Sequence, residues 1–293
     1  MRVEDPVVLV NELILPPSVE ESLHQLVAEH RDAGKLLDAG LAPTRTALFV
    51  GLPGVGKTLA ARWVASELNQ PLIVLDLASV MSSFLGRTGA NVRRVLDYAR
   101  SSRAVLLLDE LDAVAKRRDD TTEIGELKRL VTVLLQEIDS WPEGSLLLAA
   151  TNHGDLLDPA VWRRFEVVLD FPLPDVEALK TGIRSLLGGS EVDGAFADFL
   201  ARMYQGETLS FVEREVLRAR RISTMNGSDL SEVLLGTARE RFRRLPANER
   251  GPMAARMLKE SPLSQRSVSE ITGVSRDTLR KYLSLEGLGE ASA

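Results

Sequence analysis

A glycine-rich stretch, Gly51 to Thr58, constrains the fold of this chain more than any other feature of its sequence. It reads Gly-Leu-Pro-Gly-Val-Gly-Lys-Thr, follows the apolar run 47–50 and precedes a helix-prone segment at 59–68. Glycines let backbone amides curl around phosphate oxygens, and the N-terminus of the following helix adds a favourable dipole. A strand, this loop and a helix in that order predict a phosphate-binding loop.

Two side chains of this loop have separate chemical roles. We expect Lys57 to reach the β- and γ-phosphates of a nucleotide and the Thr58 hydroxyl to ligate Mg²⁺. The alternative is a glycine-rich turn with a chance lysine, which the flanking strand and helix disfavour. The expected nucleotide contacts are Gly51, Pro53, Gly54, Val55, Gly56, Lys57, Thr58 and Leu59.

Further polar residues follow two other apolar runs. Asp109 and Glu110 come directly after five apolar residues, and Asn152 lies near the end of a third predicted strand. Ligand sites of open α/β sheets gather at the carboxyl ends of strands. We expect Asp109 to hold Mg²⁺ through water, Glu110 to orient or deprotonate the attacking water, and Asn152 to hydrogen-bond the γ-phosphate or that water. An acidic surface turn is the alternative for the acidic pair, and Asp112 is interpreted as a structural or supporting residue.

Apolar runs bounded by turn residues, several of them separated by helical patterns, indicate a parallel α/β sheet. They lie at 47–50, 72–75, 104–108, 146–150 and 167–169. Helical patterns lie at 91–100 and 122–139, and they take over completely after the sheet, at about 175–187, 194–204, 210–223 and 228–244.

A stretch with two prolines and a glycine, 245–252, interrupts the helical pattern and predicts a boundary. Three short helical candidates follow it, at about 252–260, 264–272 and 275–283. The predicted domains are therefore an α/β domain at 1–174, a helical domain at 175–248 and a small all-α module at 249–293.

Composition excludes several classes of protein. The 293 residues are 44% hydrophobic and 27% charged, which is typical of a globular chain. Cysteine is absent, so disulfides, thiolate nucleophiles and cysteine-based zinc sites are excluded, and three histidines disfavour a histidine-rich metal site. The chain opens without the pattern of a secretory signal, and no apolar run is long enough to span a membrane. We expect a cytoplasmic protein that does not contact a membrane.

The net charge of −6 is unevenly distributed along the chain. Residues 213–293 contain 15 basic and 11 acidic side chains, a charge of +4, so the first 212 residues carry −10. This asymmetry is a weak indication of an anionic partner for the C-terminal part. Solvated arginine-rich helix faces are the alternative explanation.

Residues 15–244 resemble the ATPase module of the AAA family, within the larger AAA+ group. The stretch 51–58 matches the Walker A loop, Asp109 and Glu110 match Walker B, and Asn152 matches sensor 1. The resemblance implies a P-loop sheet with strand order 5-1-4-3-2 and a four-helix lid. It also implies ATP and Mg²⁺ as ligands, hydrolysis of ATP to ADP and phosphate, and a homo-oligomeric ring, usually a hexamer, with ATP held between subunits.

The stretch Asp158-Pro-Ala-Val-Trp-Arg-Arg-Phe165 resembles the arginine-finger region of this family. Arg163 and Arg164 are therefore expected to reach the γ-phosphate in a neighbouring subunit, where a fixed cation offsets charge that develops in the transition state. A solvated helix end is the alternative. The turn 139–141 stands where relatives carry an intersubunit signalling turn.

The stretch 83–86 resembles the aromatic-hydrophobic-glycine loop by which many AAA proteins grip an extended polypeptide in a central pore. Phe84 and Leu85 would make that contact, and packing into a core is the alternative. Since only about 20 residues precede the module, we expect recognition of a client to come from the pore, the C-terminus or another protein.

Two positions depart from the family pattern. The lid of relatives carries Gly-x-Ser-Gly-Ala-Asp, whereas this chain has Gly206-Glu-Thr-Leu-Ser-Phe211, which puts the coupling of the lid to the nucleotide in question. His153 follows sensor 1, where many relatives have arginine.

Residues 264–283 have the spacing of a helix-turn-helix and resemble that motif of bacterial DNA-binding proteins. Gly273 can adopt a positive φ in the turn, and Ser275 can cap the second helix. Ser275, Arg276, Arg280 and Lys281 would face bases or phosphates if this helix entered a major groove. Residues 251–293 carry only 6 basic and 5 acidic side chains, so a module that binds a protein partner is the alternative.

Three functions remain open from the sequence. The first is a ring-forming ATPase that remodels or threads a protein substrate in concert with a separately encoded partner. The second is a DNA-directed AAA+ ATPase placed on duplex DNA by its C-terminal module. A nucleotide-binding regulator without catalysis is disfavoured, because the residues for hydrolysis are present together.

Overall fold

The computed structural model describes residues 1–7, 9, 13–83, 88–115, 124–188, 194–260 and 264–289. The chain divides into two compact units, Met1–Leu173 and Pro174–Ala293. The first unit contains two clusters of buried apolar residues and the second contains one.

A mostly parallel six-stranded sheet forms the centre of the first unit, with strand order β1-β3-β4-β5-β2-β6. Its strands are β1 (Arg2–Glu4), β2 (Thr46–Gly51), β3 (Leu72–Asp76), β4 (Val105–Asp109), β5 (Leu147–Thr151) and β6 (Val167–Phe171). The five strands expected from the sequence follow the order 5-1-4-3-2, which confirms the predicted P-loop fold. The sixth strand, β1, pairs antiparallel with β3 at the edge, and an ion pair of 3.0 Å joins Glu4 to Arg62.

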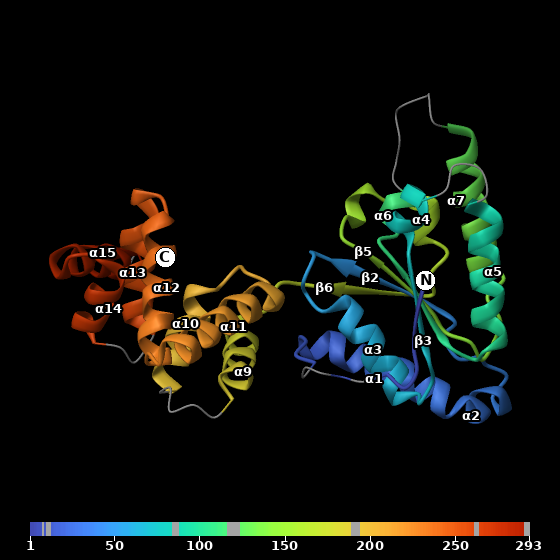
Figure 1. The fold of residues 1–293 in the computed structure, drawn as a ribbon, viewed down its shortest axis with the longest axis horizontal. Helices are drawn as coiled ribbons and strands as arrows, with labels where there is room; N and C mark the ends of the chain where they lie inside the picture. The colour runs from blue at the N-terminus through green and yellow to red at the C-terminus, as the bar shows by residue number, and fades with distance from the viewer. Residues whose placement is uncertain are drawn as a thin grey trace. The chain divides into compact units, whose positions relative to one another are not determined.

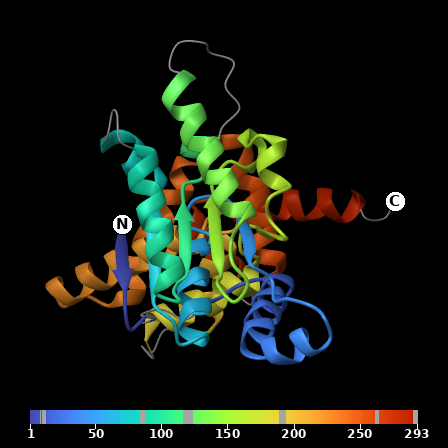
Figure 2. The same ribbon diagram turned by 90° about the vertical axis from the view of Figure 1, so that its right-hand side faces the viewer.

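Helices cover both faces of this sheet (Figure 1). They are α1 (Pro17–Arg31), α2 (Ala33–Asp38), α3 (Lys57–Glu67), α4 (Leu77–Ser83), α5 (Thr88–Ser101), α6 (Asp112–Ala115), α7 (Ile124–Asp139) and α8 (Pro159–Trp162), with a 3₁₀ turn at Gly154–Leu156. Buried residues of α1 and α3 join one apolar cluster, and those of α5 and α7 join the other. Helices α5 and α7 lie side by side on their face of the sheet (Figure 2).

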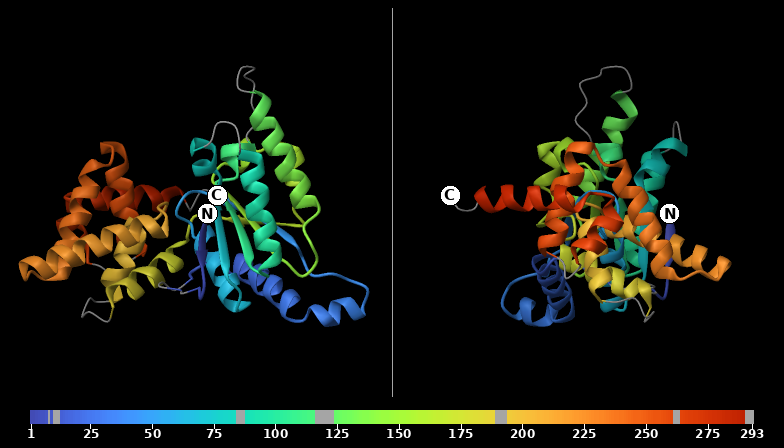
Figure 3. Two further views of the ribbon diagram at one scale, coloured as in Figure 1. Left: turned by 45° about the vertical axis from the view of Figure 1, so that its right-hand side comes forward. Right: turned by 90° about the vertical axis from the view of Figure 1, so that its left-hand side faces the viewer.

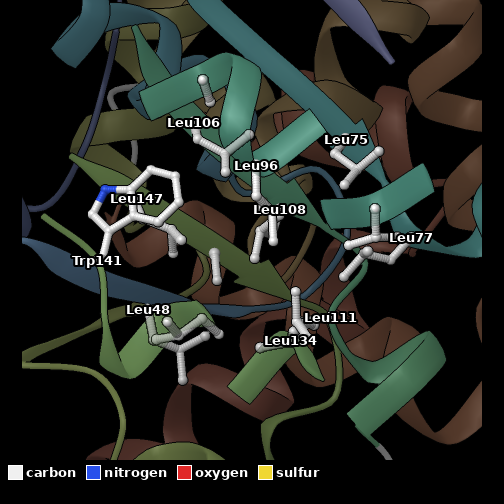
Figure 4. Packing of buried hydrophobic residues seen from close by; sticks show 14 of the residues in the cluster. Leu48, Leu75, Leu77, Leu96, Leu106, Leu108, Leu111, Leu134, Trp141 and Leu147 are labelled. Atoms are coloured by element: carbon white, nitrogen blue, oxygen red, sulfur yellow. The ribbon is translucent and has the colours of Figure 1, made fainter. Parts of the chain in front are cut away.

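Successive side chains of a strand point to opposite faces of the sheet, so strands β2 to β5 each contribute residues to both apolar clusters. On β4, Leu106 and Leu108 belong to the cluster under α5 and α7, whereas Val105 and Leu107 belong to the cluster under α1 and α3. Figure 4 shows Trp141 among the leucines of the first cluster. Each leucine fully removed from water contributes roughly 1.5–3 kcal/mol to stability, so the central strands form the most strongly buried part of the unit.

The second unit is entirely helical in the part that the structure describes. Its helices are α9 (Val176–Leu187), α10 (Gly194–Met203), α11 (Leu209–Asn226), α12 (Leu230–Arg244), α13 (Ala247–Glu260), α14 (Gln265–Thr272) and α15 (Arg276–Gly289). Carboxylate or hydroxyl side chains cap several N-termini: Asp175 caps α9, Thr208 caps α11 and Asp229 caps α12. Residues from α9 to α15 share one buried cluster.

The start of α13 differs from the sequence prediction. The helical pattern is interrupted only at Leu245 and Pro246, since α13 begins at Ala247 and contains Gly251 and Pro252. Helix α13 packs against α15 (Figure 3). At Gly251 an added Cβ would lie 2.1 Å from Cε2 of Tyr282, so only glycine permits this approach. Packing between these helices therefore outweighs the local cost of proline and glycine in a helix.

We expect Gly251→Ala to destabilise the protein by about 1–3 kcal/mol, because the new methyl group overlaps the Tyr282 ring. Urea denaturation followed by circular dichroism measures this change. Gly236→Ala on α12 is the matched control, since no atom lies within 4 Å of its added Cβ. That control should stabilise the helix by up to about 1 kcal/mol. Equal effects of the two substitutions would contradict the packing explanation.

Candidate nucleotide-binding site

The glycine-rich loop connects β2 to α3, as expected. At Gly51 an added Cβ would lie 2.3 Å from the carbonyl oxygen of Phe171 on the neighbouring strand β6. Gly56 immediately precedes α3 and has a φ of 105°, a conformation that L side chains rarely adopt. Both glycines are therefore required by the path of the backbone, which places the amides of the loop at the start of α3.

Lys57 is 94% buried at the first position of α3, since its exposed fraction is 6%. Its Nζ donates hydrogen bonds to the carbonyl oxygens of Gly51 at 2.6 Å and Leu52 at 2.9 Å, and to Oδ1 of Asn152 at 2.9 Å. Burial lowers the pKa of Lys57 to about 8, although the carboxylates of Asp109 and Asp112 partly oppose this shift. An anionic phosphate beside this ammonium group would favour its charged form.

The carboxyl ends of neighbouring strands bring the other site residues together. The register pairs Asp76 with Asp109 across β3 and β4, and Val50 with Thr151 across β2 and β5. The Thr58 hydroxyl donates to Oδ2 of Asp109 at 3.2 Å. The structure thus joins Lys57 to Asn152 and Thr58 to Asp109.

The Thr58 hydroxyl and the Asp109 carboxylate are hard oxygen groups of the kind that Mg²⁺ prefers. Among the described residues, no group of three or more histidine, aspartate or glutamate side chains is arranged to hold a metal ion. Protein sites for Mg²⁺ commonly supply one or two side chains and take the remaining ligands from phosphates and water. The pair at Thr58 and Asp109 fits that arrangement.

Glu110 has an unusual backbone and an altered acidity. Its φ is 57°, and its backbone N–H donates to Oδ1 of Asp109 at 3.0 Å. Burial raises the pKa of Glu110, and the carboxylates of Asp76, Asp109 and Asp112 raise it further. A glutamate held in a sparsely populated conformation stores strain of about 1–3 kcal/mol, which is found preferentially at functional sites. The raised pKa makes its carboxylate a stronger base for a water molecule.

The structure brings two further acidic residues to this edge of the sheet. Asp76, which the sequence analysis did not select, is the last residue of β3 and accepts bonds from the backbone N–H of Ser79 at 2.9 Å and from its hydroxyl at 2.6 Å. Asp112 accepts hydrogen bonds from Thr151 and Asn152. The signal that selected Asp109, an aspartate directly after an apolar run, also applies to Asp76.

The two arginine-finger candidates follow α8. Arg163 is exposed, whereas Arg164 forms an ion pair with Asp139 at the end of α7. The backbone oxygen of Arg164 accepts a hydrogen bond of 3.3 Å from the Thr46 hydroxyl. Within the described residues, no hydrogen bond or ion pair joins either arginine to Lys57 or to the Walker B carboxylates.

Phe84 and Leu85 lie outside the described residues. The C-terminal candidates are described: Ser275, Arg276, Arg280 and Lys281 are exposed at the start of α15 and on its first turns. Arg280 forms an ion pair of 3.5 Å with Asp277, one turn earlier on the same helix.

Phe211, where the sequence departs from the family pattern, has aromatic and cationic neighbours within the second unit. The Phe211 ring packs edge-on against Tyr204 with centroids 6.1 Å apart, and Arg241 and Arg214 lie 5.2 Å and 5.7 Å from its centre. Burial raises the pKa of Tyr204 to about 12, so this phenol stays neutral. Two guanidinium groups thus lie within cation–π distance of the Phe211 ring.

No helix in the described ranges is long and apolar enough to cross a membrane.

Comparison with known proteins identifies the segment that contains this site. The model of the ATPase family associated with various cellular activities (AAA) matches residues 47–173. An uncharacterized AAA family ATPase of Sinorhizobium fredii is 42% identical over 165 residues, which cover 56% of this chain and 50% of the relative. The proteasome-activating nucleotidase of Sulfurisphaera tokodaii is 32% identical over 244 residues, which cover 76% of this chain and 62% of the relative.

A third relative, a chloroplastic ATP-dependent zinc metalloprotease of Arabidopsis thaliana, is 36% identical over 176 residues, 57% of this chain and 21% of the relative. The chain thus spans between about one fifth and three fifths of the length of these three proteins. The matched segment contains every loop, strand end and arginine of the site described above. Residues 47–173 therefore match the model of the AAA family, and 165 residues of the chain are similar to an AAA family ATPase.

Proposed function

We propose that this protein hydrolyses ATP to ADP and phosphate and uses the energy to remodel a protein substrate. The observation that carries the proposal is the convergence of Lys57 on Asn152 at 2.9 Å and of Thr58 on Asp109 at 3.2 Å. The similarity to proteins named as an ATPase, a nucleotidase and an ATP-dependent protease supports both parts of the proposal.

The residues divide the work of hydrolysis among them. The loop amides and Lys57 bind the phosphates of ATP, and Thr58 and Asp109 would hold Mg²⁺, whose chemistry there is to neutralise charge on the β- and γ-phosphates. Glu110 accepts a proton from the attacking water or orients that water, for which its raised pKa suits it. Asn152 hydrogen-bonds the γ-phosphate or the same water.

Assembly into a ring, as a hexamer, is part of this proposal. Arg163 or Arg164 supplies a cation to the ATP of the neighbouring subunit, where it offsets charge that develops in the transition state. An exposed Arg163 with no described link to its own site supports a role across an interface. Phe84 and Leu85 line the pore and grip the polypeptide, residues 175–248 form the lid, and a separately encoded partner supplies the effector.

A DNA-directed ATPase is the second candidate, and α14 and α15 favour it. Gly273 ends α14 with a φ of 70°, and the Ser275 hydroxyl caps α15 by accepting from the Thr278 backbone N–H at 3.1 Å. Two helices joined by a short turn with glycine are typical of a helix-turn-helix, here within the module 249–293. Arg276, Arg280 and Lys281 are exposed on the second helix and could contact phosphates or bases.

A stimulation assay separates the two candidates. Steady-state ATP hydrolysis is measured at one salt concentration with the protein alone, with duplex DNA and with an unfolded polypeptide. We expect the polypeptide to raise kcat at least about threefold and Phe84→Ala to abolish the increase, because aromatic anchors carry much of the energy of a contact. Phe84→Ala should bind ATP as tightly as the unsubstituted protein. Met225→Ala, which removes a side chain that is 84% exposed on α11, is the control and should retain the stimulation.

The opposite results would reject threading. Stimulation by DNA that is lost in Arg280→Ala, with no response to polypeptide, would establish the DNA-directed function. A protein that binds ATP and hydrolyses none under any of the three conditions would reject both candidates.

A further inference from the structure

One carboxylate oxygen ties the end of β5 to the start of α6. Oδ1 of Asp112 accepts a hydrogen bond of 2.8 Å from the Thr151 hydroxyl and another of 3.1 Å from the backbone N–H of Asn152. Thr151 is fully buried and is the last residue of β5, whereas Asp112 is the first residue of α6. The contact therefore joins the turn after the Walker B strand to the turn after the sensor 1 strand.

We propose that Asp112 is a positioning residue that holds Asn152 for ATP hydrolysis. This inference rests on the proposed function and adds a residue to its machinery. Asp112 acts through the backbone and hydroxyl of its neighbours: none of its described hydrogen bonds goes to Lys57 or to Asp109.

The geometry around Thr151 explains why an acceptor oxygen is needed at this point. The register pairs the end of β5 with β2, where Thr151 lies opposite Val50, and Asn152 is the first residue beyond the paired segment. The backbone N–H of Asn152 therefore has no partner strand and donates to the Asp112 carboxylate instead. The Thr151 hydroxyl donates to Asp112 and accepts from the backbone N–H of His153 at 3.1 Å, so three consecutive residues form one bonded turn.

A second bond fixes the other side of the same junction. The backbone N–H of Leu111 donates to the carbonyl oxygen of Ala150 at 2.9 Å. With residues 111 and 112 both bonded to the end of β5, the path of the chain through Asn152 is set. The Asn152 amide oxygen then lies 2.9 Å from Nζ of Lys57, the side chain that we propose binds phosphate.

The expected effect is on the rate of the chemical step rather than on binding. Hydrogen bonds to a charged acceptor are about twice as strong as neutral ones, so their loss frees this turn. A misplacement of about 1 Å in a catalytic group can reduce a rate by roughly 100-fold, because the reacting atoms are no longer aligned. Binding of ATP depends mainly on the loop and on Lys57, which Asp112 does not hold in place.

Two substitutions of the same residue separate the hydrogen bonds from other effects. Asp112→Ala removes the acceptor, whereas Asp112→Asn keeps an oxygen that can accept both bonds. We expect Asp112→Ala to lower kcat by about 10- to 100-fold while the Kd for a fluorescent ATP analogue changes by less than about threefold. Asp112→Asn should restore kcat to within about fivefold of the unsubstituted protein. Asp38→Ala, which removes an exposed carboxylate from α2, is the control.

Hydrogen exchange tests the positioning independently of hydrolysis. The backbone amide of Asn152 should exchange at least about tenfold faster in Asp112→Ala than in the unsubstituted protein, and Asp112→Asn should restore its protection. The exchange of the Leu48 amide, inside the central strand β2, reports whether the fold itself has loosened and should not change.

The outcomes distinguish this inference from the proposed function. Faster exchange at Asn152 with a selective loss of kcat supports the positioning role. An Asp112→Ala protein with unchanged kcat, or one that loses ATP affinity and kcat equally, overturns it, as does a failure of Asp112→Asn to restore the rate. If the unsubstituted protein binds ATP without hydrolysing it, the proposed function fails, and unchanged Asn152 exchange in Asp112→Ala would then reject the positioning contact as well.

Discussion

Glu110→Gln is expected to bind ATP with normal affinity and to hydrolyse it about 100- to 10,000-fold more slowly. The amide cannot accept a proton from water, and loss of a general base costs a rate factor of this size. The substitution preserves the size of a side chain whose backbone has a φ of 57°, so the turn after β4 should keep its conformation. Single-turnover hydrolysis and the Kd for ATP measure the two quantities separately.

The expected state of this variant is a nucleotide-bound ring that persists. Size-exclusion chromatography with ATP should show a stable assembly of Glu110→Gln, which separates into smaller species once ATP is removed. Glu143→Gln, at an exposed glutamate in the turn before β5, provides a matched control and should hydrolyse ATP normally. Rapid hydrolysis by Glu110→Gln would show that another group activates the water.

Arg163→Ala and Arg164→Ala are expected to reveal a site completed by a neighbouring subunit. Removal of the finger should lower kcat by about 1,000-fold, since a fixed cation beside the transferring phosphoryl group contributes 10³–10⁵ to the rate. A Lys57→Ala protein lacks phosphate binding but keeps both arginines. Mixing it with the inactive arginine variant should recover part of the activity, because each subunit supplies what the other lacks.

The ratio of the two proteins is the informative variable in that experiment. Activity should pass through a maximum at an intermediate ratio and be nearly absent in either protein alone. The two arginine-finger candidates differ in their surroundings, because Arg164 is paired with Asp139 and Arg163 is exposed. Asp139→Ala is the control for this pair: it removes the partner of Arg164 and leaves Arg163 unaltered. Absence of recovery at every ratio would exclude a finger that acts between subunits.

Local sequence was sufficient to predict five of the six strands of the central sheet and to select candidate site residues at their ends. The five apolar runs became β2 to β6, because each is bounded by turn residues. Strands β2, β4 and β5 are buried along most of their length, whereas the edge strand β6 alternates between buried and exposed residues. The candidate site residues lie where strands end. Once a strand is predicted from the sequence, the position of its carboxyl end is predicted as well. The additional edge strand β1 was not predicted, since three residues with at most partial burial carry no apolar alternation.

Contacts between distant residues could not be predicted in this way. Asp112 follows Walker B at a spacing that predicts no partner, and its bonds reach Thr151 and Asn152 about 40 positions away. The sequence predicted that this helix begins at about residue 252, whereas α13 begins at Ala247. Helix propensities of proline and glycine do not include the contact between Gly251 and the Tyr282 ring. The sequence marked Phe211 only as a departure from the family pattern. Its contacts with Tyr204 and Arg241 depend on the packing of α11 against α12 and against the turn after α10.

The sequence by itself determined the phosphate-binding loop, the polar residues at the strand ends and the apolar runs that form the parallel strands. These follow from interactions among residues close in the chain: backbone conformations open to glycine, burial of apolar runs, and the helix that begins after Lys57. The tertiary structure alone decided which carboxylate holds Asn152, which arginine is paired and where α13 begins. Such choices depend on distances between side chains of different elements, and these distances exist only once the core has packed.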